Sequence, residues 1–386
     1  MAISHDRPVI AEPTNCRTRN RTSMLDTQNR IDQAIAAFAR GELVVVTDDD
    51  DRENEGDLFV AASLCTPEKM GFIIRHTSGI VCAPLSIEEA KRLHLDPMVS
   101  RNDAPLGTAF TVTVDVKHGL TTGISAEERT NTVRALANGN SGAADFVRPG
   151  HVFPLVAKEG GVLMRSGHTE ACVDLCKLAH LPPVGVLAEL MNDDGSVMRG
   201  RQVAEFAEKH GLKRVSIADL IAYRQVREKL VERVGEFPVA SPIGTLQGYA
   251  YVTPFDPQHH MAFVYGRIGD GEGVPTRLHR ADIIGDVFGG AKTINAVLSR
   301  FKDEGRGVIV YLRDGTAGVP VTAIPRDGET DSEAARIRQW REIGLGAQIL
   351  KDLGISSIRL ITSKKLTYVG LGGFGIEIVS TESVDG

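Results

Sequence analysis

The chain has 386 residues, of which 42% are hydrophobic and 24% charged, and its formal net charge is −6. This length predicts two domains, and the apolar content is sufficient for two hydrophobic cores. The acidic balance argues against nucleic acid as a main partner, and no apolar segment is long enough to span a membrane. Because no secretory signal is visible, we expect a cytoplasmic location.

Taken in chain order, the predicted elements describe an α/β (mixed α+β) protein of two domains. Residues 1–24 lack an apolar helical face and are expected to form a mobile tail. The first domain is expected over residues 25–234, and residues 235–244, with two prolines and two glycines, are expected to link it to a second α/β domain over 245–386. In the first domain, hydrophobic spacing predicts strands at 43–47, 58–62, 79–84, 109–115, 184–189 and 214–217, and helices at 29–40, 67–76, 87–93, 126–138, 168–180, 200–210 and 217–233.

An acidic loop separates the first two predicted strands. The segment 48–57 holds seven carboxylates and one arginine between apolar runs. So much negative charge is costly in self-repulsion, and Mg²⁺ is a natural counterion because it prefers carboxylate oxygens. A calcium EF-hand is excluded, since the register that starts at Asp51 places Ala62 where a bidentate glutamate is required. A solvated acidic turn is the alternative interpretation.

A second cluster of polar residues lies at 165–169, just before a predicted helix. An arginine, a glycine and a hydroxyl at a helix start are typical of a phosphate-binding site, because the backbone N–H groups there point outward. His168 suits metal ligation or proton transfer, although a helix cap or a surface position is the alternative.

Two further candidates lie at chain turns or strand ends. His151 follows Pro149 and Gly150 on an expected turn, which is a common place for catalytic residues. Glu189 is an acid at the exit of an apolar strand. A capping box is predicted at Ser125 and Glu128, at the start of the helix from 126. Each residue alone also fits a structural role.

The five cysteines of the chain form neither a zinc-binding pattern nor an even-numbered disulfide framework. Cys172 and Cys176 are four residues apart on a predicted helix and should share one face. Cys82 either approaches a ligand or is a buried core thiol.

Five blocks, in order, resemble the signature segments of the 3,4-dihydroxy-2-butanone 4-phosphate synthase family, which acts on ribulose 5-phosphate. The resemblance extends from about Arg30 to Lys229, and five ordered blocks are far more specific than one motif. The blocks are residues 51–57, 75–82, 121–125, 148–155 and 165–171.

The resemblance implies a role for each candidate. Glu53 and His168 would hold the divalent metals, Mg²⁺ (or Mn²⁺), with two ions in each site. His151 and Glu189 would be the catalytic proton-transfer pair, and a homodimer would share its active sites. The substrate would contact Arg52, Glu53, Asp57, Arg165, Ser166, Gly167, His168, Thr169 and Glu189.

The second half resembles the GTP cyclohydrolase II family over about residues 241–380, without that family's zinc ligands. At the three cysteine positions of the family this chain has Asp282, Thr293 and Asn295, and no cysteine follows Cys176. Zinc sites of this kind need thiolates, so we expect no zinc and no GTP hydrolysis. We therefore expect a structural or regulatory second domain. A bifunctional enzyme with an unusual metal site is the alternative, and a pocket for a different small molecule is a third possibility.

His259 and His260 also do not suggest paired metal ligation in that second half. Adjacent residues of a strand point to opposite faces of the sheet.

Overall fold

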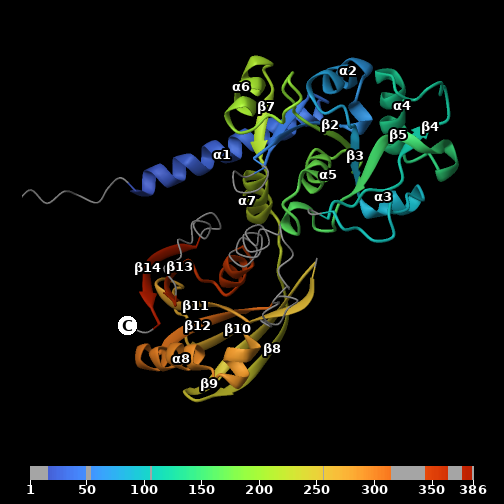
Figure 1. The fold of residues 1–386 in the computed structure, drawn as a ribbon. Helices are drawn as coiled ribbons and strands as arrows, with labels where there is room; N and C mark the ends of the chain where they lie inside the picture. Colours follow the sequence, from blue (N-terminus) through green and yellow to red (C-terminus); the bar gives the residue numbers. More distant parts are fainter. Residues whose placement is uncertain are drawn as a thin grey trace, which may run out of the picture.

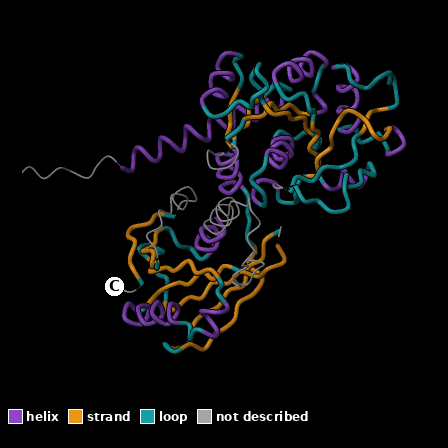
Figure 2. Tube along the Cα trace, in the orientation of Figure 1, coloured by secondary structure: helices purple, strands orange, loops and turns teal. Residues whose placement is uncertain are grey.

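The computed structural model describes residues 16–48, 54–104, 107–254, 256–313, 344–363 and 376–384, with side chains from residue 28 onward except at 256 and 257. Two seven-stranded sheets organise this part of the chain, and each belongs to a separate half of the sequence (Figures 1 and 2). The predicted α/β class with two sheet-containing domains is therefore confirmed. In the part described, no helix is both long and apolar enough to cross a membrane.

The first sheet has the strand order β4-β5-β3-β6-β2-β1-β7. Its strands are β1 (Val44–Thr47), β2 (Gly56–Ala61), β3 (Cys82–Leu85), β4 (Val114–Val116), β5 (Phe146–Val156), β6 (Gly185–Glu189) and β7 (Lys213–Ser216). The helices around it are α1 (Cys16–Ala39), α2 (Pro67–His76), α3 (Ile87–Arg92), α4 (Ala126–Leu136), α5 (His168–Leu178), α6 (Arg201–Lys209) and α7 (Ile217–Arg227).

Both faces of the first sheet are buried, which explains why its central strands are continuous apolar runs. Successive strand residues face opposite sides. In β1, Val44 and Val46 therefore join a cluster with α1 and α5 residues such as Phe38 and Leu175. Val45 joins the cluster on the other face, with Ile73 of α2 and other helix residues. A strand buried on both sides needs no polar alternation.

The second sheet has the order β14-β13-β11-β12-β10-β9-β8. Its elements are β8 (Glu232–Ser241), β9 (Gly244–Thr253), β10 (Asp256–Gly266), β11 (Val274–Arg280), α8 (Lys292–Glu304), β12 (Arg306–Leu312), a helix at 344–352, β13 (Ser357–Thr362) and β14 (Glu377–Ser383). The neighbouring His259 and His260 of β10 are exposed and buried respectively, as expected for opposite faces of a strand.

Several predicted boundaries differ from the structure. The first helix begins at Cys16 and includes part of the expected tail, because residues 16–39 contain neither glycine nor proline. The strand expected at 109–115 is reduced to Val114–Val116. The turn expected before His151 is instead inside the long strand β5, whose Arg148–Pro149 peptide is cis.

The expected linker at 235–244 is a β-hairpin instead. The helix predicted to reach residue 233 ends at Arg227, and β8 begins at Glu232 and pairs with β9. Pro238 is tolerated because β8 is an edge strand of the second sheet. The two prolines therefore mark an edge strand and its turn and not a linker.

The capping box at the start of α4 is confirmed, and it also fastens the preceding loop. Ser125 Oγ accepts a bond from the Glu128 N–H at 3.1 Å, and the Glu128 carboxylate accepts one from the Thr121 N–H at 2.6 Å. Hydrogen bonds from Thr121 hold the pKa of Glu128 well below its usual range.

We predict that Ser125→Ala lowers the free energy of unfolding by about 1 kcal/mol, the usual cost of losing a helix N-cap. Urea unfolding followed by circular dichroism measures the loss. An unchanged unfolding midpoint would contradict the capping role.

Candidate functional site

Hydrogen bonds between Asp48 and Glu55 close the acidic loop at its base. The Glu55 N–H donates to the Asp48 side chain at 2.8 Å, and the Asp48 N–H donates to the Glu55 carbonyl at 3.4 Å. Arg199 forms an ion pair with Glu55 at 3.0 Å. Arg52 and Glu53, which the sequence analysis places in the site, lie outside the described residues.

Asp57, His168 and Glu189 come together where β2 and β6 pair. Asp57 is opposite Glu189 in the antiparallel register, and its Oδ1 lies 3.9 Å from His168 Nε2. Asp57 is 2% exposed and His168 is 8% exposed. Glu189 remains partly accessible and accepts a bond from the Ser78 hydroxyl at 2.8 Å. Three predicted site residues from distant parts of the sequence are therefore close together.

The 165–168 segment forms a shaped turn at the start of α5. Arg165 Nη1 pairs with Glu170 Oε2 at 2.7 Å. Gly167 lies close beneath this pair, and a Cβ there would be 2.4 Å from Arg165 Nη1, so a larger residue would displace the arginine. The Ser166 Oγ is buried and has no hydrogen-bond partner among the described residues, which suits a ligand-facing hydroxyl. Thr169 is buried in the first turn of α5.

His151 is oriented by Asp115, a residue that the sequence analysis did not select. The His151 Nδ1 lies 2.7 Å from Asp115 Oδ2, and the His151 N–H donates to Oδ1 at 2.9 Å. Asp115 is buried, whereas the His151 side chain is 42% exposed. The carboxylate holds the Nδ1 edge, so the Nε2 edge is left for proton transfer. The sequence feature that could have identified Asp115 is its position as an acid between two apolar residues, Val114 and Val116.

The described cysteines are core residues. Cys82 is buried, and burial raises the pKa of its thiol, so it is a poor nucleophile at neutral pH. Cys172 and Cys176 are both fully buried on α5, and both thiols lie near Gly185 of β6, as expected for residues that share a helix face. A Cβ at Gly185 would lie 2.2 Å from the Cys172 Sγ, so this glycine permits close helix–sheet packing.

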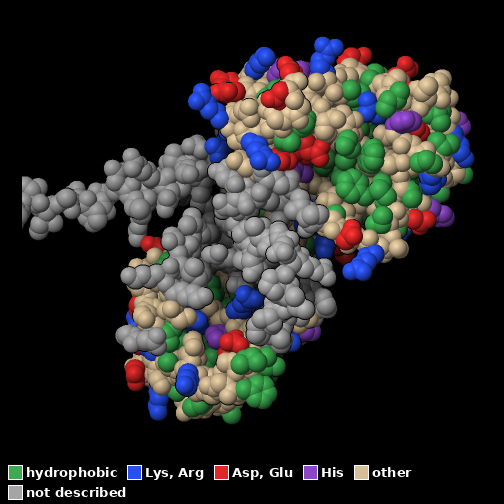
Figure 3. Space-filling view, viewed as in Figure 1, with side chains coloured by type: hydrophobic (Ala, Val, Ile, Leu, Met, Phe, Trp, Pro, Cys, Tyr) green, Lys and Arg blue, Asp and Glu red, His purple; other side chains and the backbone are tan. Residues whose placement is uncertain are grey.

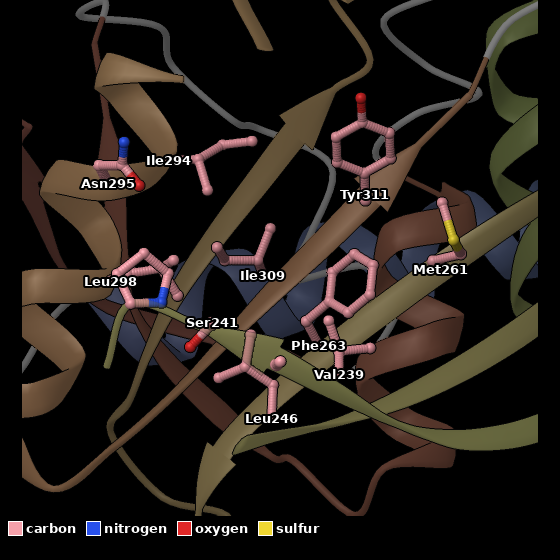
Figure 4. Close-up of a pocket in the computed structure, with 12 residues that line it drawn as sticks. Val239, Ser241, Leu246, Met261, Phe263, Ile294, Asn295, Leu298, Ile309 and Tyr311 are labelled. Atoms are coloured by element: carbon pink, nitrogen blue, oxygen red, sulfur yellow. The ribbon is translucent and has the colours of Figure 1, made fainter. Parts of the chain in front are cut away.

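The second domain has an apolar pocket, and of the three positions compared with cysteines in the sequence analysis only Asn295 lines it. The pocket measures about 360 Å³ and is lined mainly by aliphatic and aromatic side chains from β8, β9, β10, β12 and α8 (Figure 4). Asn295 lines it and donates to the Gly290 carbonyl at 3.1 Å, while Asp282 accepts from the Gly285 N–H at 3.1 Å. Both side chains therefore bond to backbone groups nearby in the sequence, and Asn295 does so from the start of α8.

A buried polar group adjoins that pocket through Tyr311. The Tyr311 hydroxyl donates to Asp286 at 2.7 Å, and His279 Nε2 lies 2.9 Å from the same carboxylate. Burial favours the neutral acid, but these bonds prevail and lower the pKa of Asp286. The other ring nitrogen, His279 Nδ1, is buried and has no hydrogen-bond partner among the described residues, and the network contains no thiolate.

Gly123 permits the contact between Asp115 and His151. A Cβ at Gly123 would lie 2.2 Å from Asp115 Oδ2 and 2.6 Å from His151 Nδ1. We predict that Gly123→Ala displaces the imidazole and lowers kcat by more than tenfold, because misplaced catalytic groups lose large factors in rate.

Gly119→Ala is the matched control for that variant. Gly119 also has a positive φ, 73°, but a Cβ there meets nothing within 4 Å. Equal loss of kcat in the two variants would show that backbone strain, and not the contact with His151, is responsible.

Comparison with protein families gives one match for each domain. Residues 32–223 match the model of 3,4-dihydroxy-2-butanone 4-phosphate synthase, and residues 232–383 match the model of GTP cyclohydrolase II. A bifunctional riboflavin biosynthesis protein of Arabidopsis thaliana, named as chloroplastic, is 47% identical over 90% of this chain and 68% of its own length. A monofunctional riboflavin biosynthesis protein of the same plant is 46% identical over 90% of this chain and 75% of its own length.

Two solved structures extend the comparison. A two-domain 3,4-dihydroxy-2-butanone 4-phosphate synthase from A. baumannii is 36% identical with a TM-score of 0.75, over 90% of this chain and 98% of that one. A 3,4-dihydroxy-2-butanone 4-phosphate synthase in complex with two magnesium ions is 46% identical with a TM-score of 0.50, over 50% of this chain and 96% of that one.

Proposed function

The chain belongs to the family of riboflavin biosynthesis proteins that join a 3,4-dihydroxy-2-butanone 4-phosphate synthase domain to a GTP cyclohydrolase II domain, and from this premise we propose its reaction. It is a lyase of the synthase family. We propose that the first domain converts ribulose 5-phosphate to 3,4-dihydroxy-2-butanone 4-phosphate and formate. The observation that carries this proposal is the meeting of Asp57, His168 and Glu189 beside the turn that starts at Arg165.

We propose Mg²⁺, or Mn²⁺, as the cofactor of this site, with two ions held by Glu53 and His168. The nearby donors fit such ions, because a buried carboxylate and an imidazole face each other at 3.9 Å, with a second carboxylate on the next strand. A bound divalent ion would polarise the sugar oxygens and stabilise negative charge that develops on them. The magnesium-bound relative supports the proposal.

We propose that the turn at 165–167 and Thr169 bind the substrate phosphate, together with Arg52. The start of α5 directs backbone N–H groups outward, and its dipole favours an anion. Asp57 and Glu189 would contact the sugar hydroxyls. The buried Ser166 hydroxyl supplies a polar atom that needs a partner.

Proton transfer is assigned to His151 and Glu189. The Asp115 carboxylate fixes the His151 ring through Nδ1, so Nε2 can take and return a proton. Glu189 carries the second exchangeable proton at Oε1 or Oε2, and the Ser78 hydroxyl orients it. Together they suit a reaction that removes a proton beside a carbonyl and later returns it.

We propose a homodimer that shares its active sites. In the sheet order β3 separates β5 from β6, so His151 lies two strands from Glu189, on the order of 10 Å away. Ile80 and Ile124 are about half exposed, and Ile124 directly follows Gly123, which lies against His151. Figure 3 shows hydrophobic side chains gathered on one face of the first domain. Exposed apolar side chains beside His151 favour a partner subunit there.

For the second domain we propose a structural or regulatory role without GTP hydrolysis. Asp282 and Asn295 stand at two of the three cysteine positions, and both make local hydrogen bonds. The monofunctional plant relative supports this role, whereas the bifunctional relative supports the alternative of a GTP cyclohydrolase II with an unusual metal site. The cytoplasmic location remains a prediction.

We predict that His168→Ala and Glu53→Gln each abolish turnover of ribulose 5-phosphate in the presence of Mg²⁺, while the dimer persists. Loss of a metal ligand removes the ions but leaves the core intact. Turnover and light scattering measure the two effects, and near-normal activity in either variant would contradict the metal assignment.

The zinc content of the purified protein separates the two interpretations of the second domain. We predict substoichiometric zinc by elemental analysis. One zinc per chain, accompanied by GTP hydrolysis that a chelator removes, would support the bifunctional alternative.

A further inference from the structure

One side chain of the second domain forms hydrogen bonds with backbone groups at the carboxyl end of α7, a helix of the first domain. Gln348, on the helix at 344–352, donates through Nε2 to the carbonyls of Gln225 and Glu228, each at 2.8 Å. Its Oε1 accepts from the Leu230 N–H at 2.6 Å. The last carbonyls of a helix lack intrahelical partners, so this amide satisfies the carboxyl end of α7 and the chain that follows.

From that helix end, a chain of charged groups leads into the first domain. Glu228 holds Arg224 through two bonds, Nε to Oε1 at 2.6 Å and Nη2 to Oε2 at 2.7 Å. The remaining Arg224 nitrogen, Nη1, donates to Asp174 Oδ2 at 2.7 Å and to the Gly160 carbonyl at 2.8 Å. Arg224 and Asp174 are buried, so each group depends on the other for compensation of its charge.

The chain of contacts ends at the turn that precedes the phosphate-binding segment. Asp174 Oδ2 also accepts from the Val162 N–H at 2.8 Å. Gly161 fits beneath this carboxylate with a φ of 62°, and a Cβ there would lie 2.1 Å from Asp174 Oδ1. The Gly161 carbonyl in turn accepts from the N–H groups of Met164 and Arg165. Arg165 is therefore placed by a turn that Asp174 and Arg224 fix.

Burial raises the pKa of Asp174 to about 6, although Arg224 opposes the rise. At neutral pH the carboxylate is therefore charged and able to bind both Arg224 and the Val162 N–H. Apolar packing surrounds the same connection, because Leu220, Leu230 and Ile349 belong to one continuous cluster of buried residues.

We infer that Gln348 is a positioning residue for the synthase reaction, which holds the 160–168 turn of the first domain in place through Glu228, Arg224 and Asp174. This inference rests on the proposed function. It gives the second domain a task that requires neither zinc nor GTP, namely to order the phosphate-binding segment of the first domain.

The test uses three full-length variants at two positions of the same helix. Gln348→Ala removes all three bonds to the first domain. Asp352→Asn is the matched control, because Asp352 is one helical turn further on and pairs at 2.7 Å with Arg233 of β8, within the second domain. Gln348→Glu keeps the acceptor for Leu230 but loses both donors.

We expect Gln348→Ala and Gln348→Glu to raise KM for ribulose 5-phosphate several-fold with a smaller change in kcat, as for loss of substrate binding. Asp352→Asn should leave KM unchanged, even if the melting temperature falls. Unchanged KM in Gln348→Ala, or an equal rise in Asp352→Asn, would overturn the inference.

A second readout does not depend on the reaction. Hydrogen exchange of the peptide that spans 158–168 should increase in Gln348→Ala and not in Asp352→Asn. If the wild type does not turn over ribulose 5-phosphate, the proposed function fails, while the exchange comparison still decides the positioning role. Equal exchange in both variants would overturn that role.

Discussion

The buried carboxylate of Asp57 is the constraint on which the first-domain site depends. It is 2% exposed at the start of β2, beside His168 and opposite a second acid, Glu189. Removing a charge from water costs several kcal/mol unless other charges compensate it. Two neighbouring acids increase that cost, and divalent cations reduce it. The acidic loop, the strand pairing and the start of α5 together favour cation binding at this place.

The second domain combines a regular fold with a sequence that contains no cysteine. Its parallel strands β11, β12 and β13 retain a continuous hydrogen-bonded arrangement. Asp282 and Asn295 each make a hydrogen bond to a nearby backbone group, and Asn295 lines a pocket that is mainly apolar. Where the second domain contacts the end of α7, the backbone groups have hydrogen-bond partners, because the Gln348 amide bonds to three of them. On the proposed account, this surface gives the second domain a role that does not depend on GTP hydrolysis.

Sequence patterns correctly predicted the elements that depend on residues close together in the sequence. The capping box at Ser125, the helix that starts at His168 and the strand that ends at Glu189 each follow from residues a few positions apart. The strand β5 was missed because Pro149 and Gly150 indicate a turn, whereas the Gly150 N–H bonds to Thr113 in the neighbouring chain segment.

Contacts between residues far apart in the sequence could not be predicted from sequence patterns. Asp115 pairs with a histidine 36 positions away, and Gln348 binds backbone groups more than 100 positions away. Neither contact follows from a helical or strand period. The predicted roles of Arg52 and Glu53 rest on the family resemblance alone, since both lie outside the described residues.

Formate release tests the central claim most directly, because both candidate reactions liberate formate. Purified full-length protein with Mg²⁺ would be given ribulose 5-phosphate or GTP in parallel. The account predicts formate from the sugar phosphate and none from GTP. Formate from GTP as well would show a second working active site and contradict the account of the second domain, and absence of formate from ribulose 5-phosphate would contradict the account of the first.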